Sequence, residues 1–209
     1  KTLLPELAEL FKRAQKTVTA ADAAAEISFE RYSYSGDAFD THATKQICKL
    51  IATIPNGVVS RYEHIDLVKT SLNTGVVRAA DGEFLLHSMI RSSDDAEKDQ
   101  LTDEVCALAA GMGFSYEKDG QYPSWGYAEH SPLREIYIDA YRRVYGHEPR
   151  VCGIHAGLEC GILSGKIDGL DCISFGPNLL HVHTPNERAD IASVARVWEY
   201  LKAILAYKE

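Results

Sequence analysis

The sequence predicts an α/β or α+β protein built in two unequal parts. Helical periods of apolar residues alternate with short apolar runs, and one cluster of turn residues interrupts the pattern. The 209 residues are 45% hydrophobic and 25% charged, which is typical of a globular chain and excludes collagen, coiled coil and disorder. No window approaches the roughly 20 consecutive apolar residues of a membrane helix, so we expect no membrane span.

The chain begins with two amphipathic helices separated by an aromatic segment. The first helix starts at Pro5, and its apolar residues recur at helical spacing up to Val18. Aromatic residues predict a strand over residues 27–34. Asp40 or Thr41 can cap the second helix, which ends before the turn residues 55–57. The residues expected on its inward face are Ala43, Ile47, Leu50, Ile51 and Ile54.

A β-hairpin and a third helix follow. Asp81-Gly82 is a strong hairpin turn signal, and apolar runs flank it at 76–77 and 84–90. A helical period from Leu101 to Met112 predicts a helix that ends at its glycines, and residues 114–118 read as a short strand. The segment GQYPSWG then breaks all periodicity, so we expect the boundary between the two parts near residue 125.

The second part is predicted to contain two further helices and two buried strands. Ser131 and Pro132 form an N-cap and first-turn pair for a helix that runs to about Val144. Residues 151–154 and 170–175 are short apolar runs that fit a buried parallel sheet. A terminal helix is predicted by apolar residues at helical spacing, namely Ile191, Val194, Ala195, Trp198, Leu201 and Leu205.

Charge and cysteine content limit the partners and the compartment. The net charge is -8 and basic residues form no run, which argues against nucleic acid and anionic membranes as main partners. Five cysteines without a CxxC pair argue against a disulfide framework or zinc ribbon and favour reduced thiols in the cytoplasm. Charges within residues 1–10 interrupt any apolar core of a signal peptide.

His181 and His183 are the two histidines that lie close together in the sequence. Residues two apart on an extended segment point to the same side, so both imidazoles could reach one metal ion. The alternative is a pair of polar loop histidines, because no third or fourth ligand follows nearby. Thr184 and Glu187 have the spacing of a capping box, which we interpret as a turn that fixes the backbone just after His183.

His155 and Glu159 follow the predicted strand at 151–154, where ligands of α/β sheets bind. The imidazole and the carboxylate could bind a substrate amine or carboxylate, and neighbouring glycines let the backbone approach it. A tight strand-to-helix turn is an equally good interpretation. Cys160 has no base nearby in the sequence and is interpreted as an inert thiol. HExxH, P-loop, GxGxxG and GxSxG motifs are all absent.

Several segments in one order resemble the aminoacyl-histidine dipeptidases, also called Xaa-His dipeptidases, which are bacterial relatives of carnosinase among the dinuclear zinc peptidases. The strongest matches are HAGLECGIL at 155–163, GLDCISFGP at 169–177 and HTPNER at 183–188. PNGV at 55–58, TSLNTGV at 70–76, IRS at 90–92 and GQYPSW at 120–125 match upstream. The resemblance spans essentially the whole chain and is weakest before Phe39.

The resemblance implies a zinc-binding α/β catalytic domain interrupted by a ferredoxin-like lid. Residues 1–125 correspond to the later part of the lid, which pairs with a second lid in a homodimer. Residues 126–209 correspond to the C-terminal segment of the catalytic domain. The resemblance implies that His183 binds one of two zinc ions and that His181 has no ligand role. The residues implied near the substrate are His155 and Glu159 in the substrate-binding turn and Asn73 and Arg91 on the lid.

The activity implied is hydrolysis of dipeptides that end in histidine, such as β-alanyl-histidine. The general base and the other zinc ligands of the family belong to segments before the lid, so no catalytic residue is expected in this chain. Because the chain lacks those motifs, we expect it to be the C-terminal part of a longer enzyme and inactive alone, and Lys at residue 1 agrees with this expectation. Two alternatives remain: a non-catalytic dimerisation or binding module derived from the lid, and a self-sufficient metal enzyme using His181 and His183.

Overall fold

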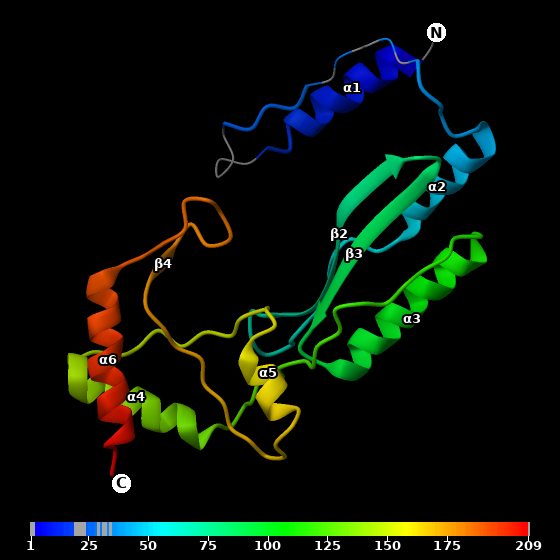
Figure 1. Ribbon diagram of the computed structural model, residues 1–209. Helices are drawn as coiled ribbons and strands as arrows, with labels where there is room; N and C mark the ends of the chain where they lie inside the picture. The colour runs from blue at the N-terminus through cyan, green and yellow to red at the C-terminus, as the bar shows by residue number, and fades with distance from the viewer. Residues whose placement is uncertain (1–2, 19–23, 29, 31–32, 34, 209) are drawn as a thin grey trace. The chain divides into compact units, whose positions relative to one another are not determined.

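The computed structural model describes residues 3–18, 24–28, 30, 33 and 35–208 (Figure 1). Contacts divide the chain into two compact units, Lys1–Ala38 and Phe39–Glu209. The predicted boundary near residue 125 falls inside the second unit and stays a prediction. Within the described residues, no helix is long and apolar enough to cross a membrane.

The first unit is built on helix α1, Leu3–Gln15. Gln15, the last residue of α1, contacts the segment that follows the helix. Its side chain donates to the Ala25 carbonyl at 2.9 Å and accepts from the Ile27 amide at 2.6 Å. The strand predicted over residues 27–34 is not confirmed: residues 27, 28, 30 and 33 have no regular structure, and the other four positions lie outside the described residues.

The second unit begins with helix α2, Thr41–Thr53, and a three-stranded antiparallel sheet. The strands are β1 (Gly57–Arg61), β2 (Val68–Ala80) and β3 (Glu83–Ser92), in the order β1-β2-β3. The predicted hairpin is confirmed: β2 and β3 are joined by Asp81 and Gly82, whose φ angles of 54° and 78° give the positive-φ pair of a type I′ turn. Helix α3, Asp95–Gly111, follows with Asp94 as its N-cap.

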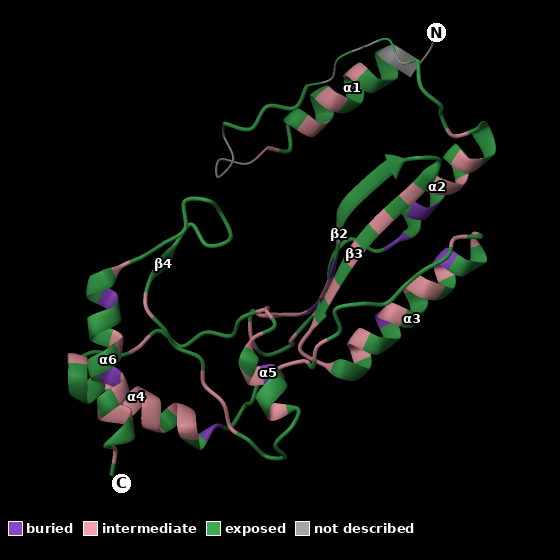
Figure 2. Ribbon diagram, viewed as in Figure 1, coloured by how far each residue is buried: buried purple, intermediate pink, exposed green. Residues whose placement is uncertain are grey.

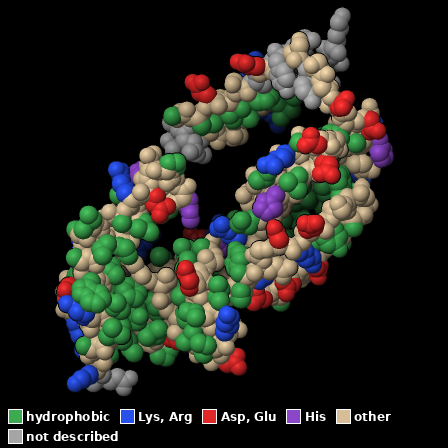
Figure 3. Space-filling model, viewed as in Figure 1, with side chains coloured by type: hydrophobic (Ala, Val, Ile, Leu, Met, Phe, Trp, Pro, Cys, Tyr) green, Lys and Arg blue, Asp and Glu red, His purple; other side chains and the backbone are tan. Residues whose placement is uncertain are grey.

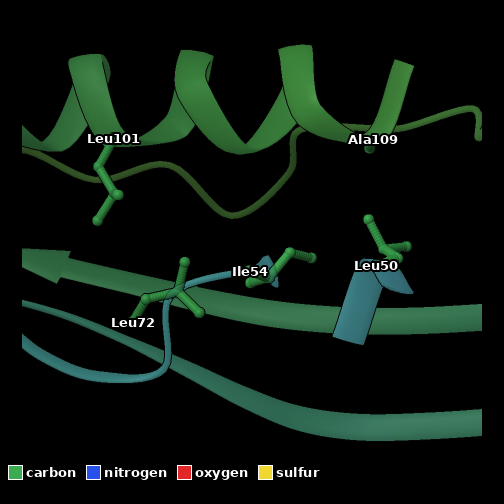
Figure 4. Close-up of a cluster of buried hydrophobic side chains, with 5 residues drawn as sticks. All are labelled: Leu50, Ile54, Leu72, Leu101 and Ala109. Carbon is green, nitrogen blue, oxygen red and sulfur yellow. The ribbon is translucent and has the colours of Figure 1, made fainter. Parts of the chain in front are cut away.

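Helices α2 and α3 pack on one face of this sheet (Figures 1 and 2). The buried cluster between them consists of Leu50, Ile54, Leu72, Leu101 and Ala109 (Figure 4). Side chains of β3 alternate, so that Leu86 and Ile90 pack on this cluster while Leu85 and Met89 are exposed on the outer face. Ile51 was expected to face inward but is 43% exposed, because it lies about 100° around the helix from Leu50.

The rest of the second unit contains helices α4 (Pro132–Tyr145), α5 (Glu159–Ser164) and α6 (Ile191–Leu205). Ser131 caps α4 as predicted, and its hydroxyl also donates to the Asp171 carboxylate at 2.8 Å. Helices α4 and α6 are joined by the buried Tyr200, whose hydroxyl donates to the Tyr137 carbonyl at 2.7 Å. Burial raises the pKa of Tyr200 to about 12.

Three predicted strands are wrong, because residues 114–118, 151–154 and 170–175 have no ladder partner in the described chain. The sheets of the described chain are antiparallel, and the second contains only β4 (Leu179–Leu180) and β5 (Arg188–Ala189). The predicted α+β class is confirmed, whereas the described residues form no parallel sheet. An apolar run becomes a strand only where a neighbouring strand completes its hydrogen bonds.

Candidate functional site

The outer face of the β2–β3 hairpin carries two of the predicted substrate-binding residues. Arg91 on β3 lies directly opposite Ser71 on β2, and Asn73 lies opposite Met89 two pairs further along. Because side chains two residues apart on a strand share a face, Asn73 and Ser71 point to the same side of the sheet. This side is the one that α2 and α3 leave open.

The turn of residues 154–157 docks on this face. His155 Nε2 lies 2.7 Å from Ser71 Oγ, although the two residues are 84 positions apart. A narrow cleft forms here between the end of β3, the turn and the aromatic side chains of Tyr122 and Trp125. We call it the Arg91 cleft, and it is lined by Arg91, Ser92, Ser93, Tyr122, Trp125 and residues 154–157.

Glycines allow the turn and helix α5 to approach the segment that carries these aromatic residues. A Cβ atom on Gly157 would lie 2.4 Å from the Tyr122 ring, and one on buried Gly161 would lie 3.0 Å from the Pro123 carbonyl oxygen. The sequence led us to expect that these glycines open the backbone to a substrate. In the structure they instead make room for packing against residues 122–125.

The electrostatics of the cleft are set by one charged group. Burial, and then the positive charge of Arg91, lower the pKa of His155, and a hydrogen bond to the Val68 backbone only partly opposes them. His155 is therefore neutral at pH 7. Among the described residues no carboxylate pairs with Arg91. The cleft thus presents an uncompensated guanidinium, which suits an anionic group.

The four residues predicted near the substrate are only partly brought together. Arg91 and His155 line the same cleft, and Asn73 lies on the same sheet face but outside the cleft lining. Glu159 is exposed in the first turn of α5 and does not line it either. Their roles stay predictions. Sequence reasoning did not single out Ser71, Tyr122 or Trp125, although each lies within a segment that carries the family resemblance.

His183 lies on an exposed loop that the β4–β5 pair closes. The φ angles of His181 and His183 are 54° and 63°, so this segment is not extended and the argument that both imidazoles point to one side is wrong. His181 Nε2 instead lies 3.3 Å from a guanidinium nitrogen of Arg188. Nε2 of His181 therefore already has a partner, and the absence of a ligand role for His181 stays a prediction.

The turn after His183 is confirmed, but it is not a capping box. The Glu187 carboxylate accepts from the backbone amide of His183 at 2.8 Å, and the Thr184 hydroxyl donates to the His181 carbonyl at 2.7 Å. No helix starts there, because α6 begins later with Asp190 as its N-cap. Glu187 therefore fixes the backbone of His183.

The described residues do not by themselves complete a metal site. No group of three or more His, Cys, Asp or Glu side chains converges anywhere among them. Catalytic zinc sites supply about three protein ligands, so the His183 imidazole alone does not hold zinc tightly.

No family model matches the chain, but curated proteins and solved structures similar to it are known. The cytosol non-specific dipeptidase of Escherichia coli (strain K12) is 34% identical over 158 residues, which cover 75% of this chain and 33% of that protein. The crystal structure of aminoacylhistidine dipeptidase from Vibrio alginolyticus matches with a TM-score of 0.78 and 29% identity. That match covers 98% of this chain and 43% of the solved one.

Aminopeptidase PepT from Bacillus cereus ATCC 10987 matches with a TM-score of 0.60 and 19% identity, over 78% of this chain and 44% of that one, which supports the fold alone. Fold and relatives together define the class: the chain is a homologue of dipeptidases. Within that class, its resemblance to the aminoacyl-histidine dipeptidases is confirmed. The chain spans 33% to 44% of the length of these relatives.

Proposed function

We propose that this chain contributes the substrate-binding lid and a catalytic-domain segment to a metal-dependent dipeptidase that cleaves Xaa-His dipeptides such as β-alanyl-histidine. The observation that supports this proposal is the Arg91 cleft. A guanidinium without an acidic partner suits the C-terminal carboxylate of a dipeptide, which it can bind with two parallel hydrogen bonds. The cleft has room for about 10 Å³, so we propose that it receives the carboxylate group while the rest of the dipeptide lies outside it.

The metal is a further part of the proposal. The resemblance implies two zinc ions, and His183 is the residue we propose as a ligand of one of them. Its backbone amide is held by Glu187, which leaves the imidazole exposed on the loop. Since the described residues supply no second and third ligand beside it, the other ligands and the general base come from outside these residues. We also propose a cytoplasmic location, in keeping with the five free thiols.

Carboxylate recognition is tested by calorimetry on the 209-residue chain with two ligands, β-alanyl-histidine and its C-terminal amide. We expect the acid to bind at least about tenfold more tightly, because a charge-assisted pair contributes roughly 1.5–3 kcal/mol. Arg91→Met should abolish this difference. Arg78→Met is the matched control, since Arg78 is an exposed arginine of the same hairpin opposite Leu85 and away from the cleft. An Arg91→Met variant that still prefers the acid would refute the assignment.

Substrate specificity is tested on the native protein that carries this sequence. We expect chelator-sensitive hydrolysis of β-alanyl-histidine and slower hydrolysis of matched dipeptides without C-terminal histidine. His183→Ala should abolish hydrolysis, and His181→Ala should reduce it far less. The relative with 34% identity is named a non-specific dipeptidase, so equal rates for all dipeptides would replace the Xaa-His assignment with broad dipeptide hydrolysis.

A further inference from the structure

His155 is held by a side chain of β2. Nε2 lies 2.7 Å from Ser71 Oγ, and the backbone of Val68, also on β2, acts on the pKa of the ring. A neutral imidazole has one donor and one acceptor nitrogen, and a hydroxyl can take either role, so this hydrogen bond forms with either tautomer. Nε2 therefore already has a protein partner.

His155 contacts β2 at the position directly opposite Arg91 on β3. Ser71 is the cross-strand partner of Arg91, and the neighbouring Thr70 and Ser92 share a hydroxyl hydrogen bond of 2.8 Å. His155 is close enough to Arg91 for the positive charge to act on its ring. The turn is therefore connected through Ser71 of β2 to the end of β3, where Arg91 lies.

We propose that His155 is a positioning residue, which pins residues 154–157 to β2 and so fixes the place of the Arg91 guanidinium that receives the substrate carboxylate. This inference rests on the proposed function. A neutral ring suits this place, because protonation would put a second positive charge beside Arg91, although the Ser71 hydroxyl could still accept from Nε2. The groups that face the ring are Ser71 from β2, Arg91 from β3 and Tyr122 from the aromatic segment.

The test measures binding of β-alanyl-histidine and of its C-terminal amide to single and double variants. His155→Phe keeps a ring without the hydrogen bond to Ser71, and Ser71→Ala removes the facing hydroxyl. We expect each to weaken acid binding about tenfold, with no further loss in the double variant, because both remove one interaction. Amide binding should stay unchanged. His155→Gln, which can still accept from Ser71, should restore part of the acid binding.

Two controls separate a positioning role from damage to the fold. His130→Gln changes an exposed histidine of the same unit and should alter neither ligand. Titration of the histidine ring protons by NMR should give His155 a pKa below 6.5 that changes in Ser71→Ala. Equal weakening of acid and amide by His155→Phe, or additive losses in the double variant, overturns the inference. Failure of the wild-type chain to prefer the acid refutes the proposed function itself, and the inference with it.

Discussion

At the scale of single residues, Lys69 joins the sheet to the beginning of α3. Its ammonium lies 2.9 Å from the Asp94 carboxylate and 2.9 Å from that of Glu97. The hydrogen bond from Lys69 is the main cause that lowers the pKa of Asp94. Burial works to raise the pKa of Glu97, but the neighbouring hydroxyls of Ser60 and Thr70 and the ammonium of Lys69 outweigh it and lower the pKa.

These shifts predict an acid-sensitive contribution to stability. Both carboxyl pKa values lie below their unfolded values near 4, so the contribution is present above about pH 4 and is lost as the pH falls through the folded values. Lys69→Met should lower the free energy of unfolding by about 1–2 kcal/mol at pH 7, since the three side chains are still partly exposed. It should also flatten the acid dependence in urea denaturation between pH 3 and 7.

Lys118→Met is the control for this series. Lys118 pairs with Asp103, whose side chain is 73% exposed, so solvent screens that pair and its loss should change stability little. Equal acid slopes for the wild-type chain and Lys69→Met would show that the Lys69 network contributes nothing to the pH dependence.

Close approach of backbone to backbone makes Gly161 sensitive to a single methyl group. An added Cβ would meet the Pro123 carbonyl oxygen at 3.0 Å and Trp125 Cβ at 3.3 Å, and a carbonyl on the main chain cannot swing aside. Gly161→Ala should therefore destabilise the chain by about 1–3 kcal/mol even though alanine favours helix. Gly111→Ala, where nothing lies within 4 Å, should instead stabilise by about 0.5–1 kcal/mol. Thermal denaturation that shows the same sign for both would contradict this packing argument.

At the scale of elements, capping and turn chemistry were predictable from the sequence, whereas strand pairing was not. Asp40, Ser131 and the Asp81-Gly82 turn act locally, and each is found where its pattern predicts. The apolar run 151–154 was misread because its residues carry no information on whether a neighbouring strand is present. The contact between His155 and Ser71 could not be predicted from the sequence either, because two residues 84 positions apart are not related by any helical or strand periodicity.

The hairpin turn gives a direct test of this local control. Gly82 has a φ of 78°, which costs an L-residue about 1–2 kcal/mol, so Gly82→Ala should lower the melting temperature. Asp81→Asn should leave it nearly unchanged, because asparagine tolerates the left-handed region that Asp81 already occupies. A melting temperature that is insensitive to Gly82→Ala would mean that the turn does not limit the stability of this unit.

At the scale of the whole molecule, two surfaces stay apolar and exposed. On α6, the side chains of Ile191 and Trp198 are 84% and 57% exposed, and Figure 3 shows apolar side chains gathered over this region. On the outer face of β3, Leu85 and Met89 are 53% and 44% exposed. Single exposed apolar residues are ordinary, but contiguous groups of them mark surfaces that bind a partner.

The outer strand of the sheet is where we expect self-association. β3 has one neighbour in the described sheet, so its second edge can pair with the same edge of another copy. We predict a homodimer formed through this strand, and a shift towards monomer in Leu85→Lys, because a charge on an edge strand opposes pairing. Sedimentation velocity at micromolar concentration measures both. A full-length protein that stays monomeric at this concentration would exclude the lid-to-lid dimer.

Hydrolysis of a dipeptide needs more residues than its binding does. Dinuclear zinc chemistry needs several ligands acting as one unit, and a chain without most of these ligands cannot hold the metal ions that the reaction needs. We therefore predict that the isolated 209 residues bind β-alanyl-histidine at the Arg91 cleft without hydrolysing it, even with added zinc. The measurement is histidine release with zinc and with a chelator, beside the calorimetry. Chelator-sensitive release that disappears in both His181→Ala and His183→Ala would show that the chain is a metal enzyme in its own right.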